Sequence, residues 1–273
     1  MKKAVLCHHK CASTWFWRHI LQTLAHEAGE RAVEVNTSWR RFDEAAFVEA
    51  LDAADCIGDQ NASAATVRAL EMHAGSYRGV HLVRDPRDVL VSAYFSHLYS
   101  HVTDGWPELV THREKLQTLT PEEGLLSEMT FCRFVFDALA GWRPNSNVLE
   151  LRSEEVTADP LPAIMGIAQW FEWTIPVATI ERVLEEASYE KLAGRAKGIE
   201  NPHHHYRKGV AGDWKNWFTD RVREEFATRY GSLLVQYGYE SDDMAKFAHD
   251  EARSKEGSVG STRSKEIRVG AVR

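Results

Sequence analysis

Short apolar runs alternate along this chain with longer segments whose apolar residues recur at helical spacing. The short runs lie at residues 4–7, 32–35, 56–57, 80–83 and 148–151, and they read as strands. Between them, residues 16–24 and 131–139 carry apolar side chains three or four positions apart, as amphipathic helices do. Strands that alternate with helices indicate a parallel sheet with helices on its faces. We therefore expect an α/β fold.

The length of 273 residues favours one α/β domain with surface insertions, because two ordinary domains would need a longer chain. We expect this domain to span residues 1–250. Residues 251–273 are rich in Gly, Ser and isolated charges and lack apolar periodicity. Such a composition cannot supply a core, so we predict a disordered tail.

The net charge and the cysteine content limit the classes of partner that the protein can bind and the compartment that it suits. The formal net charge of −7 argues against broad nucleic-acid binding, which needs clustered Lys and Arg, so an anionic ligand must meet a local basic pocket. The apolar run behind Lys2 and Lys3 is too short for a signal peptide, and no stretch is long enough to insert into a membrane. Four cysteines without a disulfide framework suit the cytoplasm.

The loop at residues 8–15 reads His-His-Lys-Cys-Ala-Ser-Thr-Trp and lies between a predicted strand and a predicted helix. Backbone N–H groups and the helix dipole attract an anion at such a place. Lys10 adds a full charge, and Ser13 and Thr14 add hydroxyl donors, which suits a phosphate or sulfate. The alternative is a helix capped by Ser13 or Thr14. The triphosphate pattern GxxxxGK[ST] is absent, because Lys10 precedes Ser13 by three positions.

A second segment runs from Arg84 to His97, directly after the strand predicted at residues 80–83. Pro86 suits the first turn of a helix. Arg84 then lies at the carboxyl end of a strand, where open α/β sheets bind ligands, and Ser92 lies two turns into the helix. Both side chains can reach one anion. A surface network of ion pairs is the alternative explanation for the charges around Arg84.

A third segment, residues 207–219, reads Arg-Lys-Gly-Val-Ala-Gly-Asp-Trp-Lys-Asn-Trp-Phe-Thr. Arg207 and Lys208 place two cations side by side, and Gly209 permits close approach of the backbone to a phosphate. Gly212 allows the loop to turn back. A solvated basic turn is the alternative.

Together, the three segments resemble the motifs of the sulfotransferases that use 3′-phosphoadenosine 5′-phosphosulfate (PAPS). The first resembles the family's Lys-Ser-Gly-Thr-Thr-Trp loop, the second its 3′-phosphate motif, and the third its RKGxxGDWKNxFT signature. The resemblance runs from about Val5 to Tyr230. It implies a P-loop-like, five-stranded parallel sheet flanked by helices, PAPS as co-substrate and no required metal. Ala12 replaces the family's Gly, which would restrict the first turn to φ values that alanine tolerates.

The resemblance also implies roles for individual residues. PAPS would be held by Lys10, Cys11, Ala12, Ser13, Thr14, Trp15, Arg84, Ser92, Arg207, Lys208 and Gly209. Lys10 would in addition stabilise the departing phosphate oxygen in an in-line displacement, where positioning and charge stabilisation do most of the catalysis. The sulfuryl group would pass to a hydroxyl or amine of an acceptor. Tyr99, Trp106 and Tyr206 favour a small apolar or aromatic molecule.

The motifs do not identify the general base that deprotonates the acceptor. Many relatives carry Lys-Thr-His before the 3′-phosphate motif, whereas this chain has Gly-Asp-Gln-Asn at residues 58–61. Other sulfotransferase branches use a carboxylate, so Asp59 is the first candidate, followed by His97 and His101. Asp59 could instead cap a turn, and the two histidines could be a helical pair facing solvent or core.

Three further segments depart from the family or leave alternatives open. Residues 152–156 lack the family's adenine-contacting Tyr. Residues 103–129 are either a lid or an ordinary surface insertion. The ligand-type residues at 7–11 cannot all face one ion, and residues 203–205 are more typical of a polar rim, so we expect no metal site.

Two other functional classes compete with sulfuryl transfer. A different P-loop-like phosphotransferase is disfavoured by the missing GxxxxGK[ST] spacing. A protein that binds PAPS, or its product 3′,5′-diphosphoadenosine (PAP), without catalysis stays an alternative because the family His is absent. The sequence does not indicate an oligomeric state.

Overall fold

The computed structural model describes residues 1–35 and 42–241, and the chain divides into two compact units, residues 1–219 and 220–273. The first unit contains a five-stranded sheet in the order β2-β3-β1-β4-β5, and every neighbouring pair is parallel. Its strands are β1 (Lys2–Cys7), β2 (Ala32–Val35), β3 (Cys56–Asp59), β4 (Tyr77–Val83) and β5 (Val148–Arg152). This confirms the α/β fold with a five-stranded parallel sheet.

Strand β1 lies at the centre of the sheet, where Val5 pairs with Gly58 on one side and Val80 on the other. Successive side chains of a strand point to opposite faces. Ala4 and Leu6 accordingly belong to one buried cluster and Val5 and Cys7 to the other. All four are fully buried, which is why the strand reads as a continuous apolar run.

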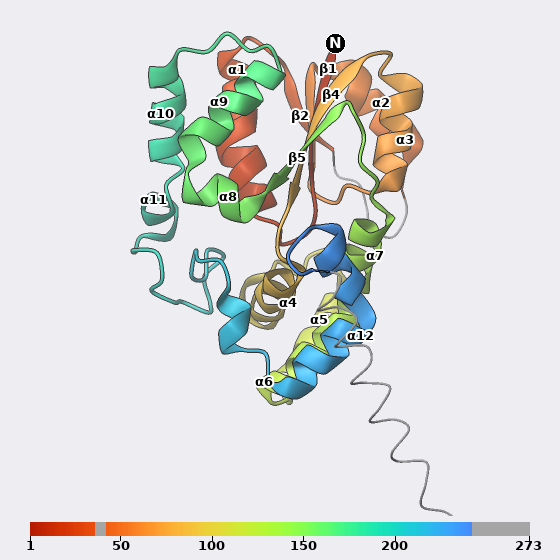
Figure 1. Ribbon diagram of the computed structural model, residues 1–273, viewed down its shortest axis with the longest axis vertical. Helices are drawn as coiled ribbons and strands as arrows, with labels where there is room; N and C mark the ends of the chain where they lie inside the picture. Colours follow the sequence, from red (N-terminus) through yellow and green to blue (C-terminus); the bar gives the residue numbers. More distant parts are fainter. Residues whose placement is uncertain (36–41, 242–273) are drawn as a thin grey trace, which may run out of the picture. The chain divides into compact units, whose positions relative to one another are not determined.

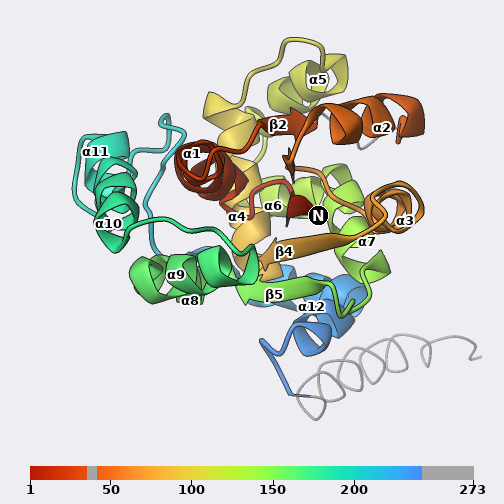
Figure 2. The same cartoon turned by 90° about the horizontal axis from the view of Figure 1, so that it is seen from above.

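Helices cover both faces of the sheet (Figures 1 and 2). The face of Val5 and Cys7 packs against η1 (Trp15–Leu21, a π-helix), α1 (Gln22–Glu27), α9 (Pro160–Trp170) and α10 (Val177–Glu186). The face of Ala4 and Leu6 packs against α2 (Glu44–Ala53) and α3 (Ala64–His73). The helices thus cover the two faces of the sheet, and the connecting loops lie at the ends of the strands.

The carboxyl end of β4 leads into α4 (Pro86–Phe95), which begins where the Asp85 carboxylate accepts a hydrogen bond of 2.9 Å from the Arg87 N–H. Helix α4 continues as the π-helix η2 (Ser96–Ser100). The remaining elements of this unit are α5 (Pro107–Leu116), α6 (Pro121–Phe131), α7 (Arg133–Gly141), α8 (Ser153–Ala158), α11 (Tyr189–Ala193) and the 3₁₀ turn η3 (Asp213–Asn216). Segment 103–129 therefore contains α5 and most of α6. Its action as a lid stays a prediction.

The second unit is described as far as residue 241 and consists of α12 (Asp220–Gln236) and the turn after it. Phe226 is buried, and its ring centroid lies 5.5 Å from that of Tyr230. The predicted tail at 251–273 lies outside the described residues, so the domain spanning 1–250 stays a prediction. Within residues 1–35 and 42–241, no helix combines the length and the apolar character needed to cross a bilayer.

Candidate active site

A cavity of about 430 Å³ lies at the carboxyl edge of the sheet, within the first unit. The segments after four strands contribute to its wall, with Lys10 three residues after β1 and Gln60, Arg84 and Ser153 directly after β3, β4 and β5. The wall also includes residues 12–15, Ser92 on α4 and residues 204–211. Three segments that are far apart in the sequence thus meet at one place, where parallel sheets bind ligands.

The first loop takes a backbone conformation that favours glycine. Lys10 and Ala12 have φ values of 64° and 60°, in the left-handed region. The expectation that Ala12 restricts the turn to φ values comfortable for alanine is therefore wrong. Ala12 accepts about 1–2 kcal/mol of strain at this position.

The two hydroxyls of the first loop do not cap the following helix. Ser13 Oγ donates to Gln60 Oε1 at 3.0 Å, and Thr14 Oγ1 donates to the same atom at 3.4 Å. Thr14 precedes η1 without making a side-chain cap. This contradicts the alternative in which the two hydroxyls serve only as helix caps. Both residues line the cavity.

Lys10 and Arg84 place two positive charges beside each other at the cavity wall. Arg84 Nη1 donates to the backbone carbonyl of Lys10 at 3.1 Å. Burial, followed by the nearby charge of Arg84, lowers the pKa of Lys10 to about 8. Two partly buried cations beside each other favour an anionic ligand, which would offset their mutual repulsion.

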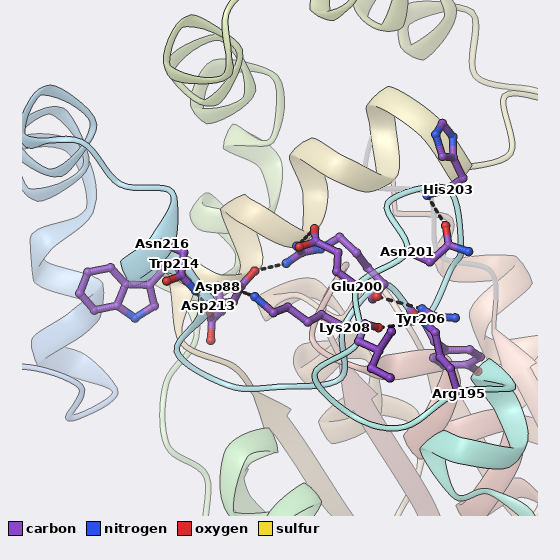
Figure 3. A network of polar contacts seen from close by, with 12 residues as sticks. Asp88, Arg195, Glu200, Asn201, His203, Tyr206, Lys208, Asp213, Trp214 and Asn216 are labelled. Carbon is purple, nitrogen blue, oxygen red and sulfur yellow. Dashed lines mark hydrogen bonds and ion pairs between the residues drawn. The ribbon is translucent and has the colours of Figure 1, made fainter.

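The loop of the third segment, at residues 207–214, is fixed to α4 through Asp88 (Figure 3). The Asp88 carboxylate accepts from the backbone N–H groups of Gly212 at 2.6 Å and Trp214 at 2.9 Å. Asp213 accepts from both Arg207 and Lys208. Burial raises the pKa of the Asp213 carboxyl, but these two cations outweigh it and lower the pKa to about 2. The loop therefore presents its cations in a fixed arrangement.

Gly209 cannot be replaced without moving its neighbours. Its φ is +70°, and a Cβ at this position would overlap the ring of Tyr189. Tyr189 is held in turn, because its hydroxyl donates to the carbonyl of Tyr206 at 2.9 Å. The glycine is required here by close packing as well as by backbone conformation.

Asp59 does not lie at the cavity wall. It is 1% exposed at the end of β3, and its carboxylate accepts from the Asn61 N–H and from Thr66 Oγ1, both at 2.9 Å. The Asp59 carboxylate thus ties the end of β3 to α3 (Ala64–His73) in this structure, and its role as the base stays a prediction that its position does not support.

His97 is fully buried and also stands back from the cavity. Its Nδ1 lies 2.7 Å from Glu128 Oε1, and its Nε2 lies 3.1 Å from Nε2 of His9. His9 itself lines the cavity, next to Lys10. His97 therefore lies behind His9 and not at the cavity wall, and its role as the base stays a prediction.

Two groups of described residues have ligand-type atoms close together, His9 with His97 and His101, and His97 with Glu128 and Cys132. We do not assign either as a metal site. The nitrogen atoms of His9 and His97 are at hydrogen-bonding distance, and the charge of Lys10 acts on both His9 and His101. A divalent cation would add to that positive charge.

The model of the family described as "Sulfotransferase domain" matches residues 66–238. The chain belongs to this family. The match includes the segments that begin at Arg84 and Arg207, which line the cavity.

Among curated relatives, the human sulfotransferase 2A1 is 28% identical over 165 residues, which cover 54% of this chain and 53% of that protein. The rat sulfotransferase 1 family member D1 is 26% identical over 170 residues, covering 55% and 52%. The chain thus spans about half the length of the curated sulfotransferases it matches. A mouse sulfotransferase crystallised with PAP shares the fold, with a TM-score of 0.58 and 16% identity over 91% of this chain and 88% of that one.

The structure of this member of the sulfotransferase-domain family brings together nearly all the residues predicted to hold the co-substrate. All of those residues line the cavity except Cys11, whose side chain is buried and whose thiol pKa burial raises to about 12. Sequence reasoning missed His9 as a candidate base. The sequence shows that His9 is next to Lys10, but it does not show the contact with His97, which lies 88 residues away.

Proposed function

We propose that this chain is a PAPS-dependent sulfotransferase that transfers a sulfuryl group to a hydroxyl or amine of a small acceptor molecule. The observation that carries this proposal is the meeting of the three family motifs at one cavity. The volume of about 430 Å³ is typical of a small-molecule site. The family assignment and the PAP bound to the related mouse enzyme support the same conclusion.

The contacts of the cavity wall support a role for each motif. Lys10 would stabilise the phosphate oxygen that departs as the S–O bond breaks. Ser13 and Thr14 would redirect their hydroxyls from Gln60 to the 5′-phosphosulfate. Trp15 would stack on adenine, since its Nε1 donates to the Ala187 carbonyl at 2.8 Å and so fixes the ring at the wall.

The 3′-phosphate would be held by residues from the second and third motifs, and these are Arg84, Ser92, Arg207, Lys208 and Gly209. Arginine and lysine together give both bidentate hydrogen bonding and a mobile charge. Asp213 would hold the two loop cations in place before the phosphate arrives. An in-line displacement then needs the acceptor on the far side of the sulfur.

We also propose that the enzyme works in the cytoplasm, without a metal ion, and does not bind nucleic acid. Its four cysteines are all buried and unpaired, which suits a reducing compartment. The net charge of −7 disfavours broad contact with polyanions.

The test is transfer of sulfur label from PAPS to a panel of alcohols, phenols and amines. Lys10→Ala should lower the rate by about 10²–10³-fold, while Lys191→Ala, which removes an exposed lysine paired with Glu185, should leave it unchanged. Binding of PAP without labelling of any acceptor would favour the alternative of a binding protein. Tight binding of ATP with no binding of PAP would favour a phosphotransferase.

A further inference from the structure

A buried chain of hydrogen-bonding groups leads from the cavity wall into the protein behind Lys10. His9 lies in the first loop and lines the cavity, and its Nε2 is 3.1 Å from Nε2 of His97 on η2. His97 Nδ1 is 2.7 Å from Oε1 of Glu128 on α6, a carboxylate that is fully buried. Three elements of the fold thus contribute one group each, in a line that ends at the cavity.

The proton positions in this chain follow from counting donors and acceptors. Burial raises the pKa of Glu128, but His97 and His112 outweigh it and lower the pKa to about 2, so the carboxylate only accepts. His97 must therefore donate its Nδ1–H to Glu128. In neutral His97, Nε2 then carries a lone pair, and the contact of 3.1 Å requires His9 to donate its Nε2–H.

When both rings are neutral, this leaves a lone pair on Nδ1 of His9, the one nitrogen of that ring not engaged by His97. A neutral imidazole with a free lone pair at the wall of the cavity, next to Lys10, is placed to accept a proton from the acceptor. We infer that His9 is the general base of the transfer and that His97 and Glu128 form a relay that receives the positive charge. This inference rests on the proposed function.

The relay balances in protons and charge. The acceptor hydroxyl gives its proton to His9 Nδ1 as its oxygen bonds to sulfur, and His9 passes its Nε2 proton to Nε2 of His97. His97 then carries both ring protons and lies against the Glu128 carboxylate. The PAP oxygen leaves with the electron pair of the broken S–O bond, beside the Lys10 ammonium.

Electrostatics explain why His9 alone would be a poor base. Burial lowers the pKa of His9 well below its usual range, and the neighbouring charge of Lys10 lowers it further. A proton that moves on to His97 instead rests beside a carboxylate, in a pocket walled by the rings of Trp106 and Phe131. An ion pair is strong in such a dry environment.

Several titratable or charged groups surround the pair and must be considered in any pH profile. Around His9 they are Lys10, His101 and His205, and around His97 they are Glu128, His112, Cys132 and Arg113. Glu128 accepts further hydrogen bonds of 2.8 Å from His112 Nε2 and from Cys132 Sγ. Three donors on one carboxylate hold it in place for His97.

Kinetics of matched variants give the first test, with the acceptor that the wild type labels best. His9→Gln should lower kcat by about 10²–10³-fold and leave the Kd for PAP within about twofold. Glu128→Gln removes the charge behind His97, so it should lower kcat by about tenfold and move the acidic limb of the pH–rate profile to lower pH. His73→Gln, on an exposed histidine paired with Glu44, should change neither. Full activity in His9→Gln, or an unmoved acidic limb in a folded Glu128→Gln, would overturn the proposal.

The second test needs no turnover and therefore separates failure of the relay from failure of the proposed function. Long-range ¹H–¹⁵N NMR spectra of the PAP complex, assigned with His9→Gln and His97→Gln, should show neutral His97 protonated at Nδ1 and neutral His9 protonated at Nε2. A proton on Nδ1 of neutral His9 would overturn the relay whether or not sulfuryl transfer is observed. The expected tautomers in a protein that transfers no label would uphold the proton arrangement and reject the enzyme activity.

Discussion

Asp88 accepts a hydrogen bond of 2.6 Å from the backbone N–H of Gly212, which lies 124 residues further along the chain. This contact joins α4, which carries Ser92, to the loop that carries Arg207 and Lys208. The two motifs expected to hold the 3′-phosphate are therefore positioned by one buried carboxylate. Loss of the Asp88 carboxylate should weaken PAP binding and lower the stability of the fold.

Asp88→Asn should weaken PAP binding and lower the free energy of unfolding by about 1–3 kcal/mol. The asparagine keeps one acceptor oxygen, so its amide N–H₂ must face one of the two backbone N–H groups that the carboxylate accepted from. Calorimetric titration with PAP and urea unfolding measure the two effects. Asp137→Asn, on an exposed pair with Arg133, should change neither by much. A normal Kd in Asp88→Asn would show that the loop is held by other contacts.

Gly209→Ala should abolish PAP binding or reduce it at least about tenfold, because the new Cβ overlaps the Tyr189 ring and must displace the loop. The control is Gly29→Ala, where φ is +78° but nothing lies near the added Cβ. That variant should lose only about 1 kcal/mol of stability and bind PAP normally. Equal effects of the two variants on binding would contradict the role assigned to Gly209.

Ala12→Gly should raise the free energy of unfolding by up to about 1 kcal/mol, since glycine avoids the strain of φ near 60° while losing more backbone entropy on folding. Urea denaturation of the variant and the wild type measures the difference. PAP binding should be kept, because glycine follows the same backbone path. A destabilised variant would show that packing of the Ala12 methyl outweighs the strain.

The kcat/KM for PAPS should fall as the pH rises through about 8, because Lys10 is a cation below its pKa and neutral above it. Arginine stays charged throughout this range, so Lys10→Arg should retain some activity and lose the alkaline limb of the profile. An unchanged alkaline limb in Lys10→Arg would assign that limb to another group.

The strands were predictable because each contains a short apolar run, and the three inner strands β1, β3 and β4 are buried on both faces. Ala32–Val35 was predicted with its observed bounds. Strand β3 was cut short in the prediction, since Gly58 and Asp59 are typical of turns. The structure shows why a glycine lies inside this strand: the Trp17 ring packs directly on Gly58, where any Cβ would overlap it. Asp59, the last residue of this strand, was a candidate base only by analogy with sulfotransferase branches that use a carboxylate.

The cofactor side of the site was predictable because its residues cluster in local motifs, each after a strand. The order of strands in the sheet and the pairing of His9 with His97 were not, because both depend on contacts between residues far apart in the sequence. Single-sequence periodicity places a side chain on a face, but it does not identify the partner on another element. His97 was named as a candidate from its residue type, and its position behind His9 required the structure.

Calorimetric titration of the wild type with PAP and with ATP tests most directly whether the three motifs form one site. We predict one equivalent of PAP bound, ATP bound at least about tenfold more weakly, and a loss of about 1.4 kcal/mol or more of PAP binding free energy in Arg84→Ala. Arg143→Ala, an exposed arginine outside the cavity, should bind PAP as the wild type does. Equal or tighter binding of ATP, or full PAP affinity in Arg84→Ala, would contradict the account.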